Sequence, residues 1–355
     1  MSRPVLTRYE RVPGTRFRRP VIEDVPYKES PEEGPEKKGK RTPRIESPGQ
    51  VWPSTVIEQI EVASASYRFA IHEQMSDGSW CTREALEFLD PSGKGILVPL
   101  RKPLWPLPSS PLDYESETGI HREIKDFLRH HWDCRDEVAY DVLACFVLMT
   151  WRFDELTIVP YFLVLGPKES GKSKLLELLA AVCYRGYFHT NPTAAATFWI
   201  TDRYNPTLLA DNYEFWPKET RRELDGLFNA GYRRGAIVPR RPREGESKSD
   251  LEIYRVYCPK AISGTREPSD ALRSRCIRVR TSKARSPIPL IIDSAWGKQL
   301  RSQLLQYRFK HLEAPTQPND EILNRYGRIG EIFHPLLTVA PDEETGNRIA
   351  DYSKD

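Results

Sequence analysis

The sequence predicts an α/β fold built around a parallel sheet. The first observation is the order of the chain after residue 160, where short apolar stretches alternate with longer stretches that carry leucine and alanine at helical spacing. The second is the stretch GPKESGKS, residues 166–173, which follows the apolar run YFLVL and leads into KSKLLELLAAV. A strand, a glycine-containing turn and a helix in this order form one unit of such a sheet, because parallel strands need helical crossovers.

The composition is typical of a globular chain with a substantial core. The 355 residues carry a net charge of +3, and 39% are hydrophobic and 29% charged. No apolar run approaches the ~20 residues that span a bilayer, and the first residues lack the apolar segment of a secretory signal, so we expect a cytoplasmic protein with no membrane partner. The six cysteines are scattered without a C-x-x-C pair, which favours core positions over a zinc site or disulfides.

Changes of pattern divide the chain into five regions. Residues 1–50 alternate proline, glycine and charge, and we expect a disordered basic tail because they offer little apolar surface to offset the entropy of ordering. Residues 51–110 contain alternating runs that predict a small β-rich subdomain. Residues 111–158 predict two helices, the second apolar enough to pack beneath the sheet. Residues 159–285 are the predicted core, and residues 286–355 a helical lid and C-terminal tail.

Residues 166–173 have the spacing G-x-x-x-x-G-K-S of a phosphate-binding loop. Glycines let the backbone curl so that successive N–H groups point at an anion, and the following helix offers its positive dipole end. We expect Lys172 to reach the β- and γ-phosphates of ATP and the Ser173 hydroxyl to bind Mg²⁺. The residues predicted to contact the nucleotide are Gly166, Pro167, Lys168, Glu169, Ser170, Gly171, Lys172, Ser173 and Lys174. The alternative, a plain turn with a solvated lysine, would not need both glycines and the hydroxyl.

A carboxylate for the same magnesium ion is expected at the end of the apolar stretch TLLA, where Asp211 follows. The carboxyl ends of parallel strands meet at the edge where α/β sheets bind ligands. In many ATPases of this architecture a glutamate comes next and polarises the attacking water, whereas this chain has Asn212, with Glu214 two residues further on. Because an amide can orient water but cannot accept its proton, either Glu214 takes that role or hydrolysis is slow. A buried strand with a capping aspartate is the structural alternative.

The stretch CPKAISGTRE predicts another buried strand that ends in polar residues, and Thr265 is expected to orient water near the γ-phosphate. An arginine cluster follows in EPSDALRSRCIRVRTSK, with Arg273 and Arg275 among its members. Arginines supplied across a subunit boundary commonly neutralise charge on a transferring phosphoryl group. An exposed strand with alternating arginines is the alternative.

A charged hairpin is expected in the stretch AIVPRRPREGESKSDLEIYRVY, residues 236–257. Its arginines could pair with backbone phosphates of a nucleic acid without reading sequence. The candidates for nucleic-acid contact are Arg233, Arg234, Arg240, Arg241 and Arg243. Glu244 and Glu246 weaken the charge argument, and an ordinary solvent-exposed hairpin is the alternative.

These stretches together resemble a known family. Residues 160 to about 341 are similar to the AAA+-like P-loop ATPase domain of replicative helicases and primase-helicases from plasmids, phages and integrative elements. The matching stretches are PYFLVLGPKESGKSKLLELL, NPTAAATFWITDRYNPTLLADN, LDGLFNAGYRRG, CPKAISGTREPSDALRSRCIRVR and GRIGEIFHPLLTVA. The family has D-E where this chain has Asp211 and Asn212. The resemblance implies a homo-oligomeric ring, such as a hexamer, with Arg275 as the inter-subunit arginine and Arg328 as a lid arginine near the γ-phosphate.

Three functions follow from these expectations. The first is an ATP-driven motor on DNA, single-stranded by expectation, of the helicase or translocase type. The second is a nucleotide-switched protein that loads or remodels a partner and hydrolyses ATP poorly, as Asn212 suggests. The third is a regulatory or defence NTPase whose tail and β-rich region recognise a target.

Overall fold

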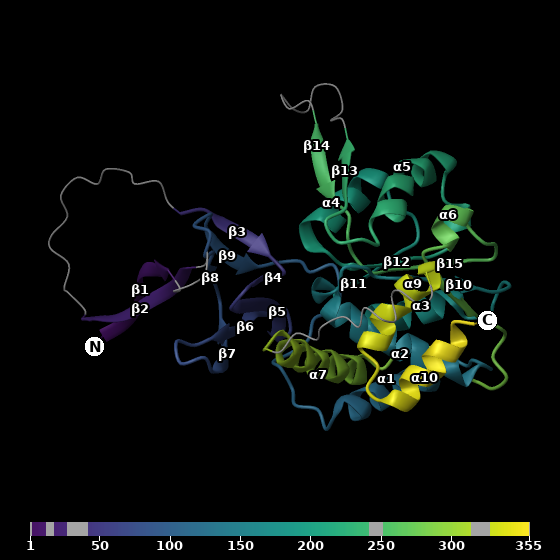
Figure 1. Ribbon diagram of the computed structural model, residues 1–355, viewed down its shortest axis with the longest axis horizontal. Coiled ribbons are helices and arrows are strands. Elements are labelled where there is room, and N and C mark those ends of the chain that lie inside the picture. Colours follow the sequence, from purple (N-terminus) through teal and green to yellow (C-terminus); the bar gives the residue numbers. More distant parts are fainter. Residues whose placement is uncertain (1, 12–17, 27–41, 241–250, 314–326, 355) are drawn as a thin grey trace.

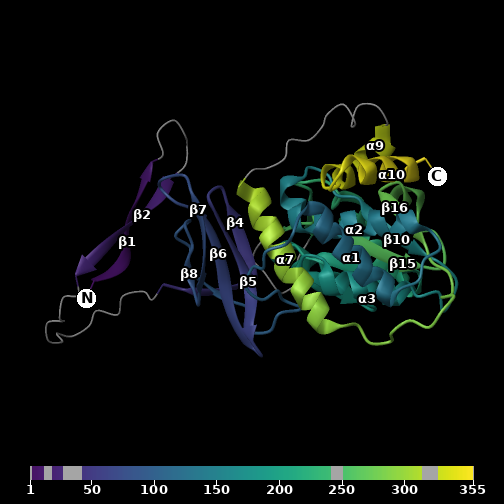
Figure 2. The same cartoon turned by 90° about the horizontal axis from the view of Figure 1, so that it is seen from below.

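The structure is a computed structural model that describes the chain except for residues 1, 12–17, 27–41, 241–250, 314–326 and 355. Figure 1 shows a β-rich part built from the first hundred residues beside a larger part that contains both helices and strands. Figure 2, turned by 90°, shows helix α7 (Ser294–Glu313) running along the boundary between the two parts.

The larger part is built around a five-stranded sheet with the order β11-β12-β15-β10-β16, in which every neighbouring pair is parallel. The strands are β10 (Tyr161–Leu165), β11 (Gly186–His189), β12 (Thr207–Ala210), β15 (Lys260–Gly264) and β16 (Cys276–Arg280). The prediction of an α/β fold with a parallel sheet is therefore confirmed. Strand β15 lies between β10 and β12, so the segments that follow these three strands emerge at one edge of the sheet.

Strand β10 is apolar throughout because both faces of the sheet are covered. Phe162 and Val164 belong to one core cluster, and Tyr161 and Leu163 belong to the other, as the period of two requires. The face that carries Phe162 and Val164 packs against α3 (Lys172–Val182) and against the helices that the next paragraph describes. The second face packs against α4 (Ala194–Tyr204) and α5 (Lys218–Ala230), beside the short helix α6 (Asp270–Arg273).

Helices α1 (Glu117–His131) and α2 (Glu137–Arg152) confirm the two helices expected before the core. Phe146 of α2 packs on Phe162 of β10 with 4.3 Å between ring centroids, which confirms that α2 lies beneath the sheet. The C-terminal region is helical in its described residues, as expected. Helices α7, α9 (Gly327–Thr338) and α10 (Glu343–Tyr352) all pack against α2, because their apolar faces share its core cluster.

The β-rich part begins earlier than residue 51. Its strands are β3 (Arg44–Ser47), β4 (Gly49–Trp52), β5 (Thr55–Ala63), β6 (Ser66–Gln74), β7 (Trp80–Ala85), β8 (Phe88–Leu89) and β9 (Ile96–Pro99). They form an antiparallel sheet β4-β5-β6-β7 and a smaller sheet β3-β9-β8. No helix among the described residues is long and apolar enough to span a bilayer.

The expectation of a disordered tail is also corrected for the described residues before residue 51. Strands β1 (Ser2–Arg11) and β2 (Arg18–Pro26) pair antiparallel, and Arg44 to Ser47 of β3 pair parallel with Ile96 to Pro99 of β9. Pairing lets the backbone groups of each strand satisfy those of its partner, which requires little apolar surface in the segment itself.

Two short 3-10 helices, Phe153–Glu155 and Tyr213–Phe215, follow α2 and β12 respectively. The expected hairpin is present in its described residues as β13 (Ile237–Arg240) paired antiparallel with β14 (Glu252–Arg255). Figure 1 shows it projecting away from the body of the protein beyond α4 and α5.

Candidate nucleotide site

The glycine-containing loop joins the end of β10 to the start of α3. Glu169 and Gly171 have positive φ angles of 62° and 81°, and Gly171 caps a helix that begins at Lys172. A side chain at Gly166 would bring its Cβ to 2.1 Å from Oγ1 of Thr281, so only glycine fits there. The curled backbone and the helix N-terminus together give the arrangement that binds anions in phosphate loops.

Contacts inside the loop fix its shape. Ser170 is buried, and its hydroxyl lies 2.6 Å from that of Thr281 and donates to the carbonyl of Pro167 at 2.8 Å. The ammonium of Lys172 donates to the carbonyls of Gly166 and Pro167 at 2.9 and 2.7 Å. Lys172 therefore folds over its own loop, and must leave these carbonyls to reach a phosphate.

Ser173 and Asp211 meet across the sheet edge. The Ser173 hydroxyl donates to Oδ2 of Asp211 at 2.8 Å, although 38 residues separate them. Asp211 follows β12 and is 3% exposed, while Ser173 lies in the first turn of α3. The strand order produces this contact, since β12 and β10 flank β15 and their following segments turn toward the same edge.

Asp211 is held by further groups that the sequence pattern did not single out. Ser263 of β15 donates to Oδ1 of Asp211 at 2.5 Å and accepts from the backbone N–H of Asn212 at 2.9 Å. The indole of Trp216 donates to the Asp211 carbonyl at 3.0 Å. The sequence could have pointed to Ser263, because it is a serine in a stretch, KAISG, expected to be a buried strand. A buried hydroxyl needs a hydrogen-bond partner.

His189 supports the same corner at the end of β11. Its carbonyl accepts from the Asp211 N–H at 3.0 Å, and its ring packs on Trp216 with centroids 5.3 Å apart. Neither ring nitrogen has a hydrogen-bond partner among the described residues. Burial lowers the pKa of His189 to about 4, so the ring is neutral at physiological pH.

Asn212 and Glu214 occupy different positions relative to the loop. Asn212 has a φ of 53°, donates from its amide to Oδ2 of Asp211 at 2.7 Å and lines the cavity at the loop. Glu214 accepts from the Thr265 N–H at 2.6 Å, and its other oxygen is buried without a partner among the described residues, near Gly264. Glu214 does not line that cavity, whereas Thr265 does.

A cavity of about 330 Å³ opens at the loop, within the size range of small-molecule sites. Its lining residues are Lys168, Glu169, Ser170, Gly171, Lys172, Ser173, Lys174, Asn212, Phe215 and Thr265. The structure therefore brings most of the predicted nucleotide-contacting residues together with Asn212 and Thr265.

The donors present fit a magnesium–nucleotide complex. A serine hydroxyl beside a carboxylate offers the hard oxygen ligands that Mg²⁺ prefers, with phosphate oxygens and water completing its shell. No cluster of three or more His, Cys, Asp or Glu side chains able to hold a metal exists in the described part of the chain. An ion at this site would thus depend on ligands that its substrate supplies.

The three arginines expected near phosphate have partners within the same chain. Arg275 donates to the carbonyls of Asn229 and Ala271. Arg273 pairs with Glu267 at 2.8 Å. Arg328 donates to the hydroxyl of Tyr232 at 3.0 Å and pairs with Glu331 at 2.8 Å.

None of these arginines lines the cavity at the phosphate loop. Arg273 and Arg328 instead line a larger groove beside β16.

The arginines expected to contact nucleic acid are similarly engaged where they are described. Arg233 pairs with Glu331 at 3.1 Å, and Arg234 donates to the Leu156 carbonyl at 2.8 Å. Arg240 pairs with Glu223 at 2.7 Å and lies over the ring of Phe198. Arg241 and Arg243 lie outside the described residues.

No protein-family model matches the chain, and no curated protein sequence matches it. Among solved structures, the chain is similar to the apo C-terminal region of NrS-1, with a TM-score of 0.33 and 10% identity over 83% of this chain and 72% of that one. It is also similar to the active helicase Cch of SCCmec type IV, with a TM-score of 0.39 and 11% identity over 86% of this chain and 75% of that one. Neither likeness is close enough to assign an activity, so the function has to be inferred from the site itself.

Proposed function

We propose that this chain is a magnesium-dependent ATPase that works as a motor on nucleic acid, single-stranded DNA in particular, in a homo-oligomeric ring. The observation that carries the ATPase part is the 2.8 Å contact between Ser173 and Asp211, directly beside a glycine-curled loop at a helix N-terminus. A strand–turn–helix of purely structural purpose does not need a hydroxyl facing a buried carboxylate at that point.

Each residue at the site has a task in this proposal. The backbone N–H groups of the loop bind the phosphates, and Lys172 exchanges its two carbonyl partners for phosphate oxygens. Ser173 and Asp211 hold the magnesium ion, which supplies positive charge against the phosphate oxygens. Ser263 keeps the Asp211 carboxylate oriented, and Trp216 holds the backbone carbonyl of Asp211. Asn212 and Thr265, which line the cavity, position water.

The DNA-motor and ring parts of the proposal rest on charge and shape. Arginines gather on the edge strand β16 and beside it, and the hairpin β13–β14 stands away from the body with further arginines following β13 in the sequence. Phosphate backbones are bound by such sequence-independent positive charge. An oligomer would let these surfaces act together.

The test is ATP hydrolysis with Mg²⁺, with and without single-stranded DNA, together with a particle mass. We expect DNA-stimulated turnover that is lost in Lys172→Ala and retained in Lys310→Ala, a matched lysine on α7 far from the loop. Mass should increase in the presence of ATP and DNA. Full turnover in Lys172→Ala would refute the ATPase proposal, and turnover without DNA stimulation or assembly would refute the motor while leaving the ATPase.

A second function, a nucleotide-operated switch with slow hydrolysis, is favoured by the placement of Asn212 and Glu214. The amide lines the cavity but cannot take a proton, and the carboxylate is bound to the backbone of Thr265 outside it. Tight ATP binding with little turnover, and faster turnover in Asn212→Glu, would support the switch. The left-handed backbone at Asn212 costs a glutamate about 1 kcal/mol, so the variant's stability must be measured alongside. Unchanged turnover in a folded variant would mean that a base is already present.

A further inference from the structure

A cavity larger than the one at the phosphate loop lies along the outer side of β16. It measures about 920 Å³ and runs between this edge strand and helices α2, α9 and α10. None of its lining residues lines the cavity at the loop. Thr281, whose hydroxyl contacts Ser170 of the loop, lines one part of it. The groove therefore lies next to the candidate nucleotide site but is lined by different residues.

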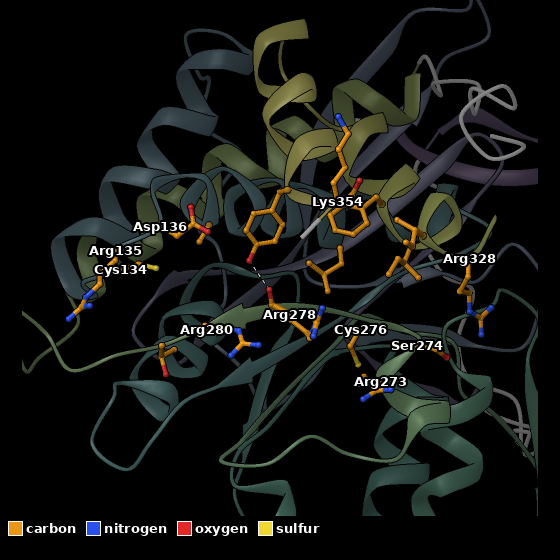
Figure 3. Close-up of a pocket in the computed structure, with 18 of the residues that line it drawn as sticks. Cys134, Arg135, Asp136, Arg273, Ser274, Cys276, Arg278, Arg280, Arg328 and Lys354 are labelled. Carbon is orange, nitrogen blue, oxygen red and sulfur yellow. Dashed lines mark hydrogen bonds between the residues drawn. The ribbon is translucent and has the colours of Figure 1, made fainter. Parts of the chain in front are cut away.

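Positive charge converges on this groove from separate parts of the chain. The basic lining residues are Arg135, Arg273, Arg278, Arg280, Arg328 and Lys354, against one carboxylate, Asp136, among the described lining residues. Asp136 is already used, because it accepts from the Val138 N–H as the cap of α2. Figure 3 shows Arg278 and Arg280 together on the β16 side of the groove and Arg328 at another end of it. Such a surface attracts anions.

Some of this charge is compensated and some is not. Glu267 pairs with Arg273 at 2.8 Å and with Arg278 at 3.6 Å, and Lys354 pairs with Asp351 at 2.7 Å. Arg135 and Arg280 form no ion pair with any described residue. Arg278 and Arg280 are both exposed and two positions apart in a strand, so they share a face about 7 Å apart. Two neighbouring guanidinium groups suit two phosphate oxygens or two successive phosphates.

Apolar side chains form the helical side of the same groove. Ile329, Ile332 and Phe333 of α9 line it, and Ile329 is 49% exposed. The ring of Tyr352 is fixed there because its hydroxyl donates to the Arg278 carbonyl at 2.7 Å. The exposed side chain of Ile329 and the ring of Tyr352 offer an apolar surface in the same groove as the arginines. Such a surface suits a ligand that carries both a flat ring and phosphates, since bases stack on apolar and aromatic side chains.

We propose that this groove is a second binding site, independent of the phosphate loop, for a ligand that carries phosphate groups and an aromatic base. Such chemistry belongs to a free nucleotide or to a short stretch of a nucleic acid strand. The phosphates pair with Arg135 and Arg280, with Arg278 beside them, and the base rests on the α9 wall at Ile329 and on Tyr352. The proposal requires no ATP hydrolysis. For a strand it deepens the nucleic-acid role proposed above for the arginines of β16, and for a free nucleotide it adds a site beyond that function.

The experiment uses the full chain with Lys172→Ala as the background, which removes nucleotide binding at the loop. Three probes are compared by fluorescence anisotropy or competition at low salt: a labelled ATP analogue, a labelled single-stranded tetranucleotide and unlabelled inorganic triphosphate. The test variant is Arg135→Ala with Arg280→Ala. Neither residue has a carboxylate partner among the described residues, so the substitution leaves no described carboxylate unpaired and the fold should be preserved. The control is Arg101→Ala with Lys102→Ala, which removes the same charge from the β-rich part.

We expect the background protein to bind a base-carrying probe, the test variant to weaken that binding about tenfold or more, and the control to leave it unchanged. Ile329→Asp should weaken it as well, because it places a carboxylate in the groove at an exposed position. Binding of the ATP analogue would identify a free nucleotide, and preference for the tetranucleotide would identify a strand.

Three results would overturn the proposal. They are no binding of either base-carrying probe, equal losses in the test and control variants, and triphosphate binding as tightly as the nucleotide. Because no turnover is measured, an inactive ATPase could still pass this experiment and an active one could fail it.

Discussion

The buried hydroxyl of Ser263, on the strand next to the one that Asp211 follows, is the group that orients Oδ1 of the Asp211 carboxylate. Ser263 donates to one carboxylate oxygen while Asn212 and Ser173 donate to the other, so the carboxylate has one set of partners for each oxygen. A hydrogen bond to a charged group is worth about 1.5–3 kcal/mol. The magnesium requirement of the proposed ATPase should therefore depend on Ser263, although Ser263 does not line the cavity.

Ser263→Ala should lower turnover about tenfold or more and raise the Mg²⁺ concentration needed for half-maximal activity. The physical reason is that Asp211 loses a partner and the Asn212 N–H becomes unpaired. The measurement is a Mg²⁺ titration of ATPase activity. Ser302→Ala is the control, since Ser302 is also buried and bonded but lies on α7 beside Ser109. An unchanged magnesium requirement in a folded Ser263→Ala protein would contradict the positioning role.

Because His189 is buried, it should make the free energy of unfolding fall as the pH is lowered below 6.5. Its pKa is about 4 in the folded protein because burial disfavours the charged ring, against about 6.5 when unfolded. The unfolded state therefore binds the proton first, and stability is fully present above pH 6.5 and falls as the pH drops toward 4. The loss attributable to this residue is about 3 kcal/mol.

The measurement is urea unfolding at a series of pH values. His189→Leu should reduce the slope between pH 6.5 and 4, while His130→Leu, at an exposed histidine of α1, should leave it unchanged. Part of the slope should persist, because burial also lowers the pKa of His121 to about 4. A slope identical to that of the unmodified protein would show that His189 does not titrate in this way.

At the scale of elements, the described part of the hairpin β13–β14 is anchored to the body at two arginines. Arg240 lies over Phe198 of α4 and pairs with Glu223 of α5, and Arg255 pairs with Asp202 of α4 at 2.9 Å. These contacts of Arg240 and Arg255 fix the orientation of the described part of the hairpin relative to helices α4 and α5. Any phosphate contacts should therefore depend more on the arginines that follow Arg240 than on Arg240 itself.

Replacing Arg241 and Arg243 together by alanine should weaken binding of single-stranded DNA and reduce the slope of log affinity against log salt by about 1.4, or about 0.7 for each lost contact. Arg240→Ala should change that slope less. The measurement is DNA binding over a range of salt concentrations. A larger slope change in Arg240→Ala than in the double variant would reverse this assignment, and no change in either would remove the hairpin from the DNA site.

At the scale of the whole molecule, a buried charge network joins the β-rich part to the α/β part. Glu58 of β5 contacts Arg185 at 2.9 Å, Arg308 of α7 at 3.1 Å and the hydroxyl of Tyr184 at 2.7 Å. Arg308 is 1% exposed and also pairs with Asp154 at 2.8 Å. The two parts are thus joined by buried charged side chains, each of which is compensated by a charge of opposite sign from another segment of the chain.

Glu58→Ala should destabilise the protein by about 3–5 kcal/mol, because removing one member of a buried ion network leaves the others uncompensated. The measurement is the free energy of unfolding in urea. Glu61→Ala is the matched control on the same strand. Its partner Lys298 is partly exposed, and such a pair is worth less than about 1 kcal/mol. Equal effects of the two variants would mean that the network contributes little.

Local patterns alone were enough to predict the parallel α/β core, the two helices before it and the contact partners Ser173 and Asp211. An apolar run, a glycine-bearing turn and leucines at helical spacing act over a few residues, so the linear sequence carries them. The disordered tail was mispredicted in its described residues, and the packing of the C-terminal helices was not predicted, for a related reason. Whether β3 pairs with β9, or α9 packs on α2, depends on surfaces supplied by remote parts of the chain.

Only the tertiary structure decided which strands are neighbours, and that choice made the site. With β15 between β10 and β12, Ser263 meets Asp211, Glu214 is taken by the backbone of Thr265, and the arginines of β16 face a groove on the outer edge of the sheet. The sequence determined which chemical groups are available. The order of the strands determined which of them meet, because contacts between residues far apart in the chain depend on packing rather than on spacing.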